Sequence, residues 1–163
     1  MDIMKIVTTA LLVSLVGCAT SYQSSGFTGG FTDTQLAPDV FRVSFSGNAF
    51  TSSDRVQDFA FLRAAELTLA SNARYFAAMS SADQSRNDTY DSPGSAYTTG
   101  TVTGYGNTAK YSGNTTYSSP QVHTYFKPGV GMMIRTFQIK PDGGFAFDAE
   151  FIVTSLRTKY GVK

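Results

Sequence analysis

Alternating apolar and polar residues predict β-strands with one buried face at two places in the chain. The first is residues 40–45, whose apolar face would consist of Phe41, Val43 and Phe45. The second is residues 145–156, whose apolar face would consist of Phe145, Phe147, Ala149, Phe151 and Val153. Asp148 and Glu150 would then project together from the opposite face, about 7 Å apart by strand geometry. A solvated polar face accounts for this acidic pair better than the two carboxylates of a glycosidase.

A turn connects the second of these strands to another apolar run before it. Pro141-Asp142-Gly143-Gly144 is a strong turn signal, and residues 132–139 have the composition of a strand. We therefore predict an antiparallel hairpin between residues 132–139 and 145–156. Two further short strands are expected, at residues 75–80 and 121–126.

One segment has the periodicity of a helix. From residue 54 to about residue 70, apolar side chains recur at spacings of three and four, namely Val56, Phe59, Ala60, Leu67 and Ala70. The preceding run Thr51-Ser52-Ser53-Asp54 supplies side-chain oxygens for an N-cap, and Asn72 marks the expected end. One helix and four or five strands predict an α+β fold, with the helix packed on one face of an antiparallel sheet.

The composition changes between residues 81 and 120, where Thr, Tyr, Gly and Ser dominate. Val102 is the only aliphatic side chain larger than Ala in this stretch. Such a segment buries too little apolar surface to offset the entropy of ordering it, although Thr and Tyr favour strands. It is therefore either disordered or an exposed β-ribbon. We expect a mobile insertion with transient ribbon character at about residues 82–119.

The first 17 residues have the layout of a secretory signal. Lys5 precedes an apolar stretch at residues 6–16, which is shorter than the ~20 residues of a membrane-spanning helix. With Cys18, the residues Leu15, Val16 and Gly17 match the lipobox of bacterial lipoproteins. Small residues there precede the cleavage site, and the thiol after it takes a diacylglycerol. We expect cleavage before Cys18 and a lipid anchor, with palmitate among its acyl chains, on that residue.

The alternatives to a lipoprotein signal are an ordinary signal peptide, or a short core helix with a structural cysteine. Cys18 is the only cysteine in the chain and cannot form an internal disulfide, which favours lipidation. Ala19 follows it in place of the Asp that retains lipoproteins in the inner membrane of enteric bacteria. We therefore expect a lipid-anchored protein of the outer membrane that faces the periplasm.

These signals divide the chain into three parts. Residues 1–17 are the signal peptide, and residues 18–38 are a lipidated tether, flexible because it is rich in Ser, Gly and Thr. Gly29-Gly30 allows a backbone turn within that tether. Residues 39–160 are a single α+β domain, interrupted by the low-complexity insertion at about residues 82–119.

Composition and charge exclude several functions. Only 15% of residues are charged and the net charge is near +1, whereas nucleic-acid binding requires a concentrated basic face. His123 is the sole histidine, and a zinc site needs three or four ligands. A serine hydrolase would need a nucleophile elbow of the G-x-S-x-G type, which the chain lacks. We expect no bound metal, no cofactor and no catalytic residue.

Arg63 and Glu66 are three residues apart on the predicted helix, close enough to interact. Arg63 follows the apolar stripe of the helix, so it would be partly buried with Glu66 as its partner. We interpret the two as a structural ion pair. A docking site for a partner protein is the alternative.

Several short motifs resemble a family of small, functionally uncharacterised lipoproteins of Gram-negative outer membranes. The motifs are Gly29-Gly30-Phe31, Asp33-Thr34-Gln35-Leu36, Val43-Ser44-Phe45-Ser46-Gly47-Asn48, Arg63-Ala64-Ala65-Glu66-Leu67-Thr68 and Phe147-Asp148-Ala149. The resemblance covers over a third of the chain and leaves out the Tyr/Thr/Gly-rich insertion. It implies an envelope lipoprotein and no particular activity.

The sequence therefore predicts a cell-envelope lipoprotein with a non-catalytic structural or protein-interaction role. Its partners would be membrane lipid, through Cys18, and another envelope protein. Two alternatives remain. The Tyr/Thr/Gly-rich segment could bind cell-wall glycan or another polysaccharide, because aromatic residues separated by small polar ones are typical of adaptable contact surfaces. A hydrolase is the other, and it requires a pocket with convergent acids.

Overall fold

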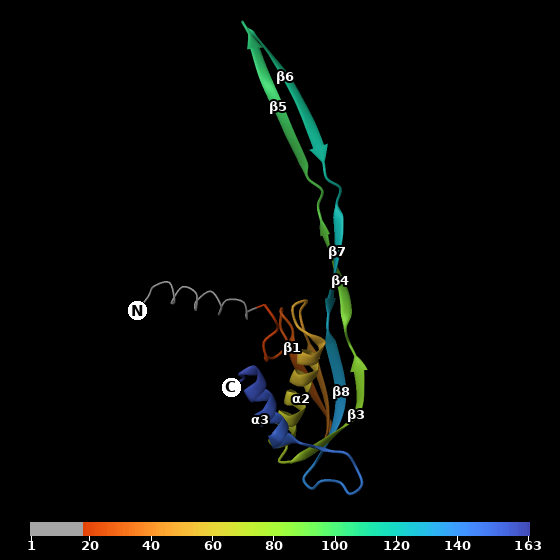
Figure 1. Ribbon diagram of the computed structural model, residues 1–163. Helices are drawn as coiled ribbons and strands as arrows, with labels where there is room; N and C mark the ends of the chain where they lie inside the picture. Colours follow the sequence, from red (N-terminus) through yellow and green to blue (C-terminus); the bar gives the residue numbers. More distant parts are fainter. Residues whose placement is uncertain (1–17) are drawn as a thin grey trace, which may run out of the picture. The chain divides into compact units, whose positions relative to one another are not determined.

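The computed structural model of the protein describes residues 18–163. The expected signal peptide, including Leu15, Val16 and Gly17 of the lipobox, lies outside the described residues. The chain divides into two compact units: the first extends to Arg86 and resumes at residues 126–163, and the second is residues 87–125 (Figure 1). The second unit corresponds to the expected insertion, with its boundaries shifted towards the C-terminus.

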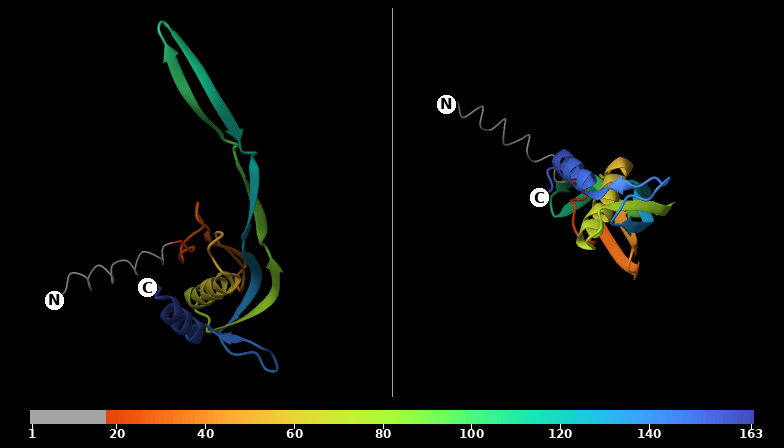
Figure 2. Two further views of the ribbon diagram at one scale, coloured as in Figure 1. Left: turned by 45° about the horizontal axis from the view of Figure 1, so that its top comes forward. Right: turned by 90° about the horizontal axis from the view of Figure 1, so that it is seen from below.

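The first unit contains a five-stranded antiparallel sheet and two helices. The strands follow the order β1-β2-β8-β3-β9: β1 is Gly30–Ala37, β2 Val40–Ser46, β8 Gly129–Phe137, β3 Tyr75–Asp83 and β9 Phe147–Asp148. Helix α2 (Ser53–Ala70) lies between the sheet and helix α3 (Ala149–Tyr160), as Figure 2 shows. The α+β class is confirmed. The finer prediction of one helix on one sheet is wrong, because the described chain has two helices and three sheets.

The core lies between α2 and the sheet face that it covers. The apolar face predicted for β2 is buried, since Phe41 is 6% exposed and Val43 and Phe45 are fully enclosed. Strands β8 and β3 add Ile134 and Phe76 to the same face, and α2 adds Val56, Phe59, Ala60, Leu62, Ala64 and Ala65. The central strands alternate because only one face of the sheet is covered.

The sequence signals at both ends of α2 are confirmed. The Ser52 side chain caps the helix by accepting a hydrogen bond from the backbone N–H of Arg55, which satisfies one of the free donors of the first turn. Ser71 is the C-cap. Asn72 follows with a φ of 56°, a left-handed conformation that Asn tolerates better than most residues.

The strand predicted at residues 145–156 is wrong, because most of this segment forms α3. Asp148, expected on a solvated strand face, is the N-cap of α3 and accepts hydrogen bonds from the backbone N–H groups of Glu150 and Phe151. Gly161 ends the helix with a φ of 63°. The helix packs residues at helical spacing against the core: Ala149, Ile152, Val153, Leu156 and Tyr160. Period-two alternation would bury Phe151, which is 71% exposed.

The flexible tether predicted at residues 18–38 is also wrong. Residues 30–37 form β1 and pair with β2 along its length, so their backbone polar groups are satisfied by the sheet. Phe31 packs on Tyr22, with 5.0 Å between the ring centroids. The error has a physical cause: β1 is an edge strand whose remaining side chains are mostly exposed, so its composition resembles that of a linker.

The second unit consists of paired strands. Strand β4 (Arg86–Ser92) pairs with β7 (Gln121–Lys127), and β5 (Ala96–Tyr105) pairs with β6 (Thr108–Tyr117). Gly106, with a φ of 61°, and Asn107 form the two-residue turn between β5 and β6, the arrangement typical of tight hairpins. Of the two alternatives for this segment, the structure shows the β-ribbon, and the expected strand at residues 121–126 is confirmed.

Candidate functional site

Cys18 is the first residue that the structure describes, and its backbone is bound to the folded unit. The side-chain amide of Asn48 donates a hydrogen bond of 2.7 Å to the Cys18 carbonyl oxygen. Cys18 is exposed and its thiol forms no disulfide. The thiol therefore lies at the surface of the first unit.

Two residues further on, Thr20 is buried and fastens this segment to the domain. Its side chain is 1% exposed, and its hydroxyl donates to the carbonyl oxygen of Thr28 at 2.7 Å and accepts from the backbone N–H of Asn48 at 2.9 Å. The Thr20 backbone N–H also donates to the hydroxyl of Thr51 at 2.9 Å. We call Thr20, Asn48 and Thr51 the threonine clamp. Two residues of extended chain span at most about 7 Å, so the clamp holds Cys18 close to the domain.

Gly29 and Gly30 allow the segment to approach the sheet closely enough for the clamp to form. Their φ angles are 101° and 134°, which side chains rarely adopt. A Cβ on Gly29 would lie 2.2 Å from the carbonyl oxygen of Ser46, and one on Gly30 would lie 2.5 Å from that of Gln23. The Gly-Gly turn expected from the sequence is therefore present, but it serves docking rather than flexibility.

The structure brings Arg63 and Glu66 together, with Arg63 Nη1 3.4 Å from Glu66 Oε2. Glu66 also accepts a hydrogen bond from the Tyr22 hydroxyl, and its Oε1 lies 2.9 Å from Arg157 Nη2. Arg63 in turn pairs with Asp33 at 2.8 Å. The cluster joins α2, α3, β1 and the segment before β1.

Both oxygens of Glu66 have partners in this cluster, so the carboxylate is engaged in holding elements together. Burial, together with the hydrogen bond to Glu66, raises the pKa of Tyr22 above its ordinary value. Burial opposes the charge on Arg63, but the hydrogen bond and negative charge of Asp33 outweigh it and raise the Arg63 pKa. Sequence reasoning found Arg63 and Glu66 from their helical spacing and missed Tyr22, Asp33 and Arg157, which only the tertiary fold brings near.

The acidic pair expected on one strand face does not exist as such, because Asp148 and Glu150 belong to the start of α3. Asp148 Oδ2 lies 3.2 Å from Arg74 Nε. The pKa of Asp148 is lowered first by the hydrogen bond from the backbone N–H of Phe151, and then by Arg74. Asp148 is thus a carboxylate that caps a helix, with no features of an acid catalyst.

His123 lies on β7 and is exposed. Within residues 18–163 there is no group of three or more His, Cys, Asp or Glu side chains that could hold a metal ion. Within the same residues, no helix is long and apolar enough to cross a membrane.

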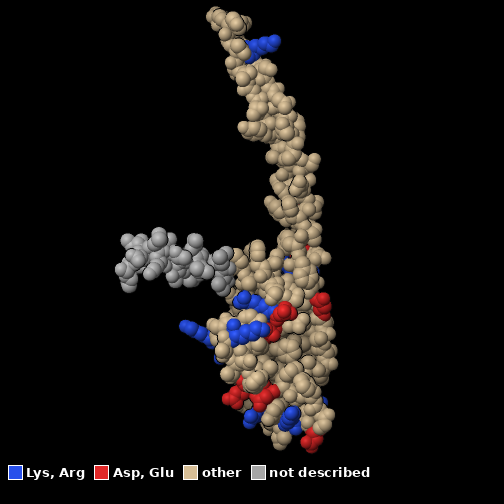
Figure 3. Space-filling view, in the orientation of Figure 1, with Lys and Arg blue, Asp and Glu red and all other residues tan. Residues whose placement is uncertain are grey.

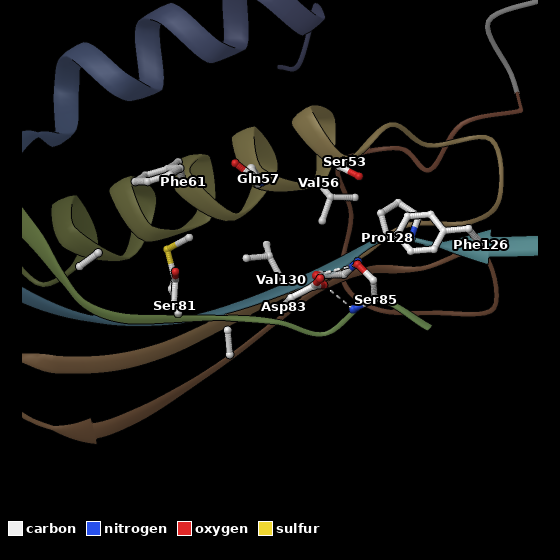
Figure 4. Close-up of a pocket in the computed structure, with 14 residues that line it drawn as sticks. Ser53, Val56, Gln57, Phe61, Ser81, Asp83, Ser85, Phe126, Pro128 and Val130 are labelled. Atoms are coloured by element: carbon white, nitrogen blue, oxygen red, sulfur yellow. Dashed lines mark hydrogen bonds between the residues drawn. The ribbon is translucent and has the colours of Figure 1, made fainter. Parts of the chain in front are cut away.

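A groove of about 380 Å³ lies between α2 and strands β3 and β8 (Figure 4). Phe61 and Gln57 border it on the helix, and Val130 and Ser81 border it on the sheet. Asp83 is the only ionisable side chain in its lining, and hydrogen bonds from Ser85 lower the Asp83 pKa. No second carboxylate and no histidine in this lining stands beside Asp83 to complete an acid–base pair.

The β5–β6 ribbon exposes almost every side chain that it carries. One face carries small residues with Val102, Tyr111 and Tyr117, and the opposite face carries Thr, Ser and Asn side chains with Tyr97 and Tyr105. Lys110 is the only charged residue in the two strands, and Figure 3 shows this surface almost without Lys, Arg, Asp or Glu. The ribbon is therefore a surface of hydroxyl and aromatic groups with a single charge, that of Lys110.

Tyr111 covers the two glycines at the middle of the ribbon. Gly100 and Gly113 are directly opposite each other, and a Cβ on either would lie 2.5 Å or less from the Tyr111 hydroxyl oxygen. An aromatic ring over strand glycines replaces the side-chain packing that the glycines lack. Thr98 and Thr115 add a hydroxyl contact of 2.8 Å across the strands.

Fold and site together define an α+β protein with an exposed cysteine next to the threonine clamp and an exposed β-ribbon. No family model matches the chain, and no curated protein matches it. The resemblance to Gram-negative lipoproteins therefore depends on the motifs themselves.

Proposed function

We propose that this protein is a cell-envelope lipoprotein with a non-catalytic role, anchored through Cys18 in the outer membrane, where its β5–β6 ribbon contacts another envelope protein. The observation that carries the proposal is the exposure of the ribbon. Two-stranded ribbons are at best marginally stable in water, and this one contributes no buried apolar side chain to a core. The stability of the fold therefore does not explain why the chain contains this ribbon, whereas a role as a binding surface does.

The near absence of charge on the ribbon supports a protein partner. Exposed strand edges are usually protected by charged residues, prolines or bulges that prevent pairing with other chains. Strand β5 contains neither charge nor proline, and its pairing with β6 is unbroken over ten residue pairs. Its outer edge is therefore suited to accept a strand of a partner.

In-cell photo-cross-linking tests this proposal. A photoreactive residue at Tyr97 or Tyr105 in the ribbon should give a discrete adduct with another envelope protein. The matched control is Phe145 in the first unit, which is similarly exposed at 76% against 71% for Tyr97 and 82% for Tyr105. Equal adduct patterns at all three positions, or none at the ribbon, would contradict the proposal.

Tyr111 favours a second candidate, a cell-wall glycan. The hydroxyl end of its ring lies over Gly100 and Gly113, yet the residue is 60% exposed. Thr98 and Thr115 lie on the same face of the ribbon, and an aromatic ring near threonine hydroxyls is chemically suited to sugars. If glycan is the ligand, purified sacculi should bind the parent protein. The Tyr111→Ala variant should no longer bind, whereas Tyr90→Ala should have little effect on binding. Tyr90, at 59% exposed, is the matched control on β4.

A further inference from the structure

Two phenylalanines close to Cys18 are exposed and lack a role in the core. Phe27 is 107% exposed and Phe50 is 73% exposed. Phe27 lies at the tip of a tight turn that is closed by reciprocal backbone hydrogen bonds between Gly26 and Gly29, each of 3.1 Å. Phe50 lies in the loop before α2, where its backbone N–H donates to the Asn48 side chain at 3.0 Å. Both loops therefore hold a large apolar ring in solvent on an ordered backbone.

The threonine clamp connects both rings to Cys18. Asn48 bonds the Cys18 carbonyl oxygen with its amide nitrogen and the Phe50 backbone N–H with its amide oxygen. The Thr20 hydroxyl bonds the carbonyl oxygen of Thr28, the residue after Phe27. Figure 2 shows the segment at residues 18–29 and the loop before α2 at the same end of the first unit. One hydrogen-bonded platform thus presents Cys18, Phe27 and Phe50 together.

Basic side chains border the same region. A cavity of about 210 Å³ is lined by residues 25–29, residues 46–48, Arg86 and Lys127. The charged residues in that lining are Arg86 and Lys127, and both are basic. Positive charge beside exposed aromatic rings is the combination that binds anionic lipid surfaces, because apolar burial and attraction to headgroup phosphates add.

The residues that precede Cys18 indicate which partner covers Phe27 and Phe50. Residues 6–16 are an apolar run that leads to Cys18. With the proposed anchor, this run before cleavage and the acyl chains after it would both bring hydrocarbon next to Cys18. The clamp leaves no long linker to separate the domain from that membrane. A lipid bilayer is therefore the occupant that chain connectivity brings to Phe27 and Phe50.

We infer that Phe27, Phe50, Arg86 and Lys127 form a membrane-docking face, on which the two rings enter the interfacial layer of the bilayer that holds the lipid on Cys18. The basic side chains lie at the level of the headgroup phosphates. This inference rests on the proposed anchor at Cys18 and adds an orientation to it: the first unit lies directly on the membrane.

Tryptophan fluorescence in lipid vesicles tests the docking face, because the chain contains no tryptophan and a single substitution is the only reporter. The full lipidated protein, carrying Phe27→Trp, Phe50→Trp or Phe151→Trp, is reconstituted into phosphatidylethanolamine–phosphatidylglycerol vesicles with and without brominated acyl chains. Phe151 is the matched control at 71% exposed. Phe151 lies in the first turn of α3, after the N-cap Asp148, which pairs with Arg74. Arg74 follows the C-terminal end of α2, whereas Phe50 precedes its N-terminal end.

We expect Phe27→Trp and Phe50→Trp to give blue-shifted emission that brominated lipid quenches, and Phe151→Trp to give neither. Unquenched, red emission at positions 27 and 50 would overturn the inference. A blue shift without quenching would also overturn it, since a protein rather than lipid would then cover the rings. Mass spectrometry of the Cys18 peptide separates the two proposals: an unacylated peptide contradicts the anchor itself, whereas an acylated peptide with unquenched reporters contradicts only the docking face.

Discussion

Phe59 contacts three other aromatic rings in the first unit. Its ring lies 5.3 Å from that of Tyr22, 5.2 Å from that of Phe45 and 4.9 Å from that of Tyr160, measured between centroids. These rings come from α2, β2, α3 and the segment before β1, so one side chain is shared by four parts of the chain. Aromatic pairs at these separations add stability beyond that of their buried area.

Truncation of Phe59 should therefore destabilise the protein strongly. We expect Phe59→Ala to cost about 3–5 kcal/mol, the usual range for a buried Phe, and Phe151→Ala to cost less than about 1 kcal/mol, as for most exposed positions. Denaturant midpoints for the two variants and the parent protein give the comparison. A loss of stability for Phe151→Ala as large as that for Phe59→Ala would mean that Phe151 is buried, as the strand prediction for residues 145–156 requires.

Asp148 should make α3 sensitive to acid. Its pKa is lowered in the folded state by the hydrogen bond from the Phe151 backbone and by Arg74, so its stabilisation is present above the unfolded pKa of about 3.9 and is lost as the pH falls through the lower folded pKa. Asp148→Ala should cost about 0.5–2 kcal/mol near neutral pH, as for other N-caps.

Asp148→Asn is the matched control, because Asn also caps helices and does not titrate. Its stability near neutral pH should lie between those of the parent and Asp148→Ala, and its loss between pH 5 and pH 3 should be smaller than that of the parent. Thermal unfolding at a series of pH values measures both effects. Identical pH profiles for parent and Asp148→Asn would exclude the carboxylate as the source.

At the scale of elements, the strands and helix with a single consistent pattern were predictable. Strand β2 alternates cleanly, and α2 has both a helical stripe and cap residues, so local sequence and tertiary burial favour the same structure. The apolar residues of segment 145–156 fit both the two-residue period of a strand and the 3.6-residue period of a helix. Their alternation predicted a strand, while the cap at Asp148, the basic last turn and Gly161 favour a helix, and packing against α2 decided between them.

The candidate site was less predictable than the fold. The pair Arg63–Glu66 could be found from local spacing, because neighbours on a helix are only three or four residues apart. The motif that singled out Cys18 is equally local. The clamp could not, because Thr20 and Thr51 are 31 residues apart and each is an unremarkable polar residue in its own segment. The Gly29-Gly30 turn was the one local signal of a close approach, and its composition was equally consistent with a linker.

The β5–β6 ribbon should be dispensable for the stability of the first unit. Residues 93–119 supply no member of the hydrophobic core, and loop closure entropy grows only slowly with length. Replacement of residues 93–119 by a short Gly/Ser linker should leave the melting temperature of the first unit nearly unchanged.

The same replacement made at β1, residues 30–37, is the control for this prediction. It removes a strand that pairs with β2 and should lower the melting temperature markedly. Loss of cooperative unfolding on removal of the ribbon would show that the ribbon contributes to the core.

At the scale of the whole molecule, the proposed function depends on attachment at one atom, the sulfur of Cys18. Cys18→Ser should abolish lipidation, because acyl transfer requires the thiol, and unprocessed precursor should accumulate. Immunoblots of cells labelled with a fatty-acid analogue measure both effects. Ser21→Ala, close to the cysteine and exposed, should be processed normally. Continued acyl labelling of Cys18→Ser would falsify the proposed anchor.

The threonine clamp also has a consequence for the order of maturation and folding. If Cys18 carries the proposed anchor, a membrane protease and an acyltransferase must each take the backbone around Cys18 into an active site. A chain whose Thr20 is already enclosed has no slack to enter one. Maturation would then have to precede docking, so the N-terminal segment is the last piece to join the fold. A variant that cannot close the clamp, such as Thr20→Ala, should mature at least as fast as the parent. In the mature variant, the orientation of the first unit relative to the membrane would be free, whereas in the parent the clamp would fix it.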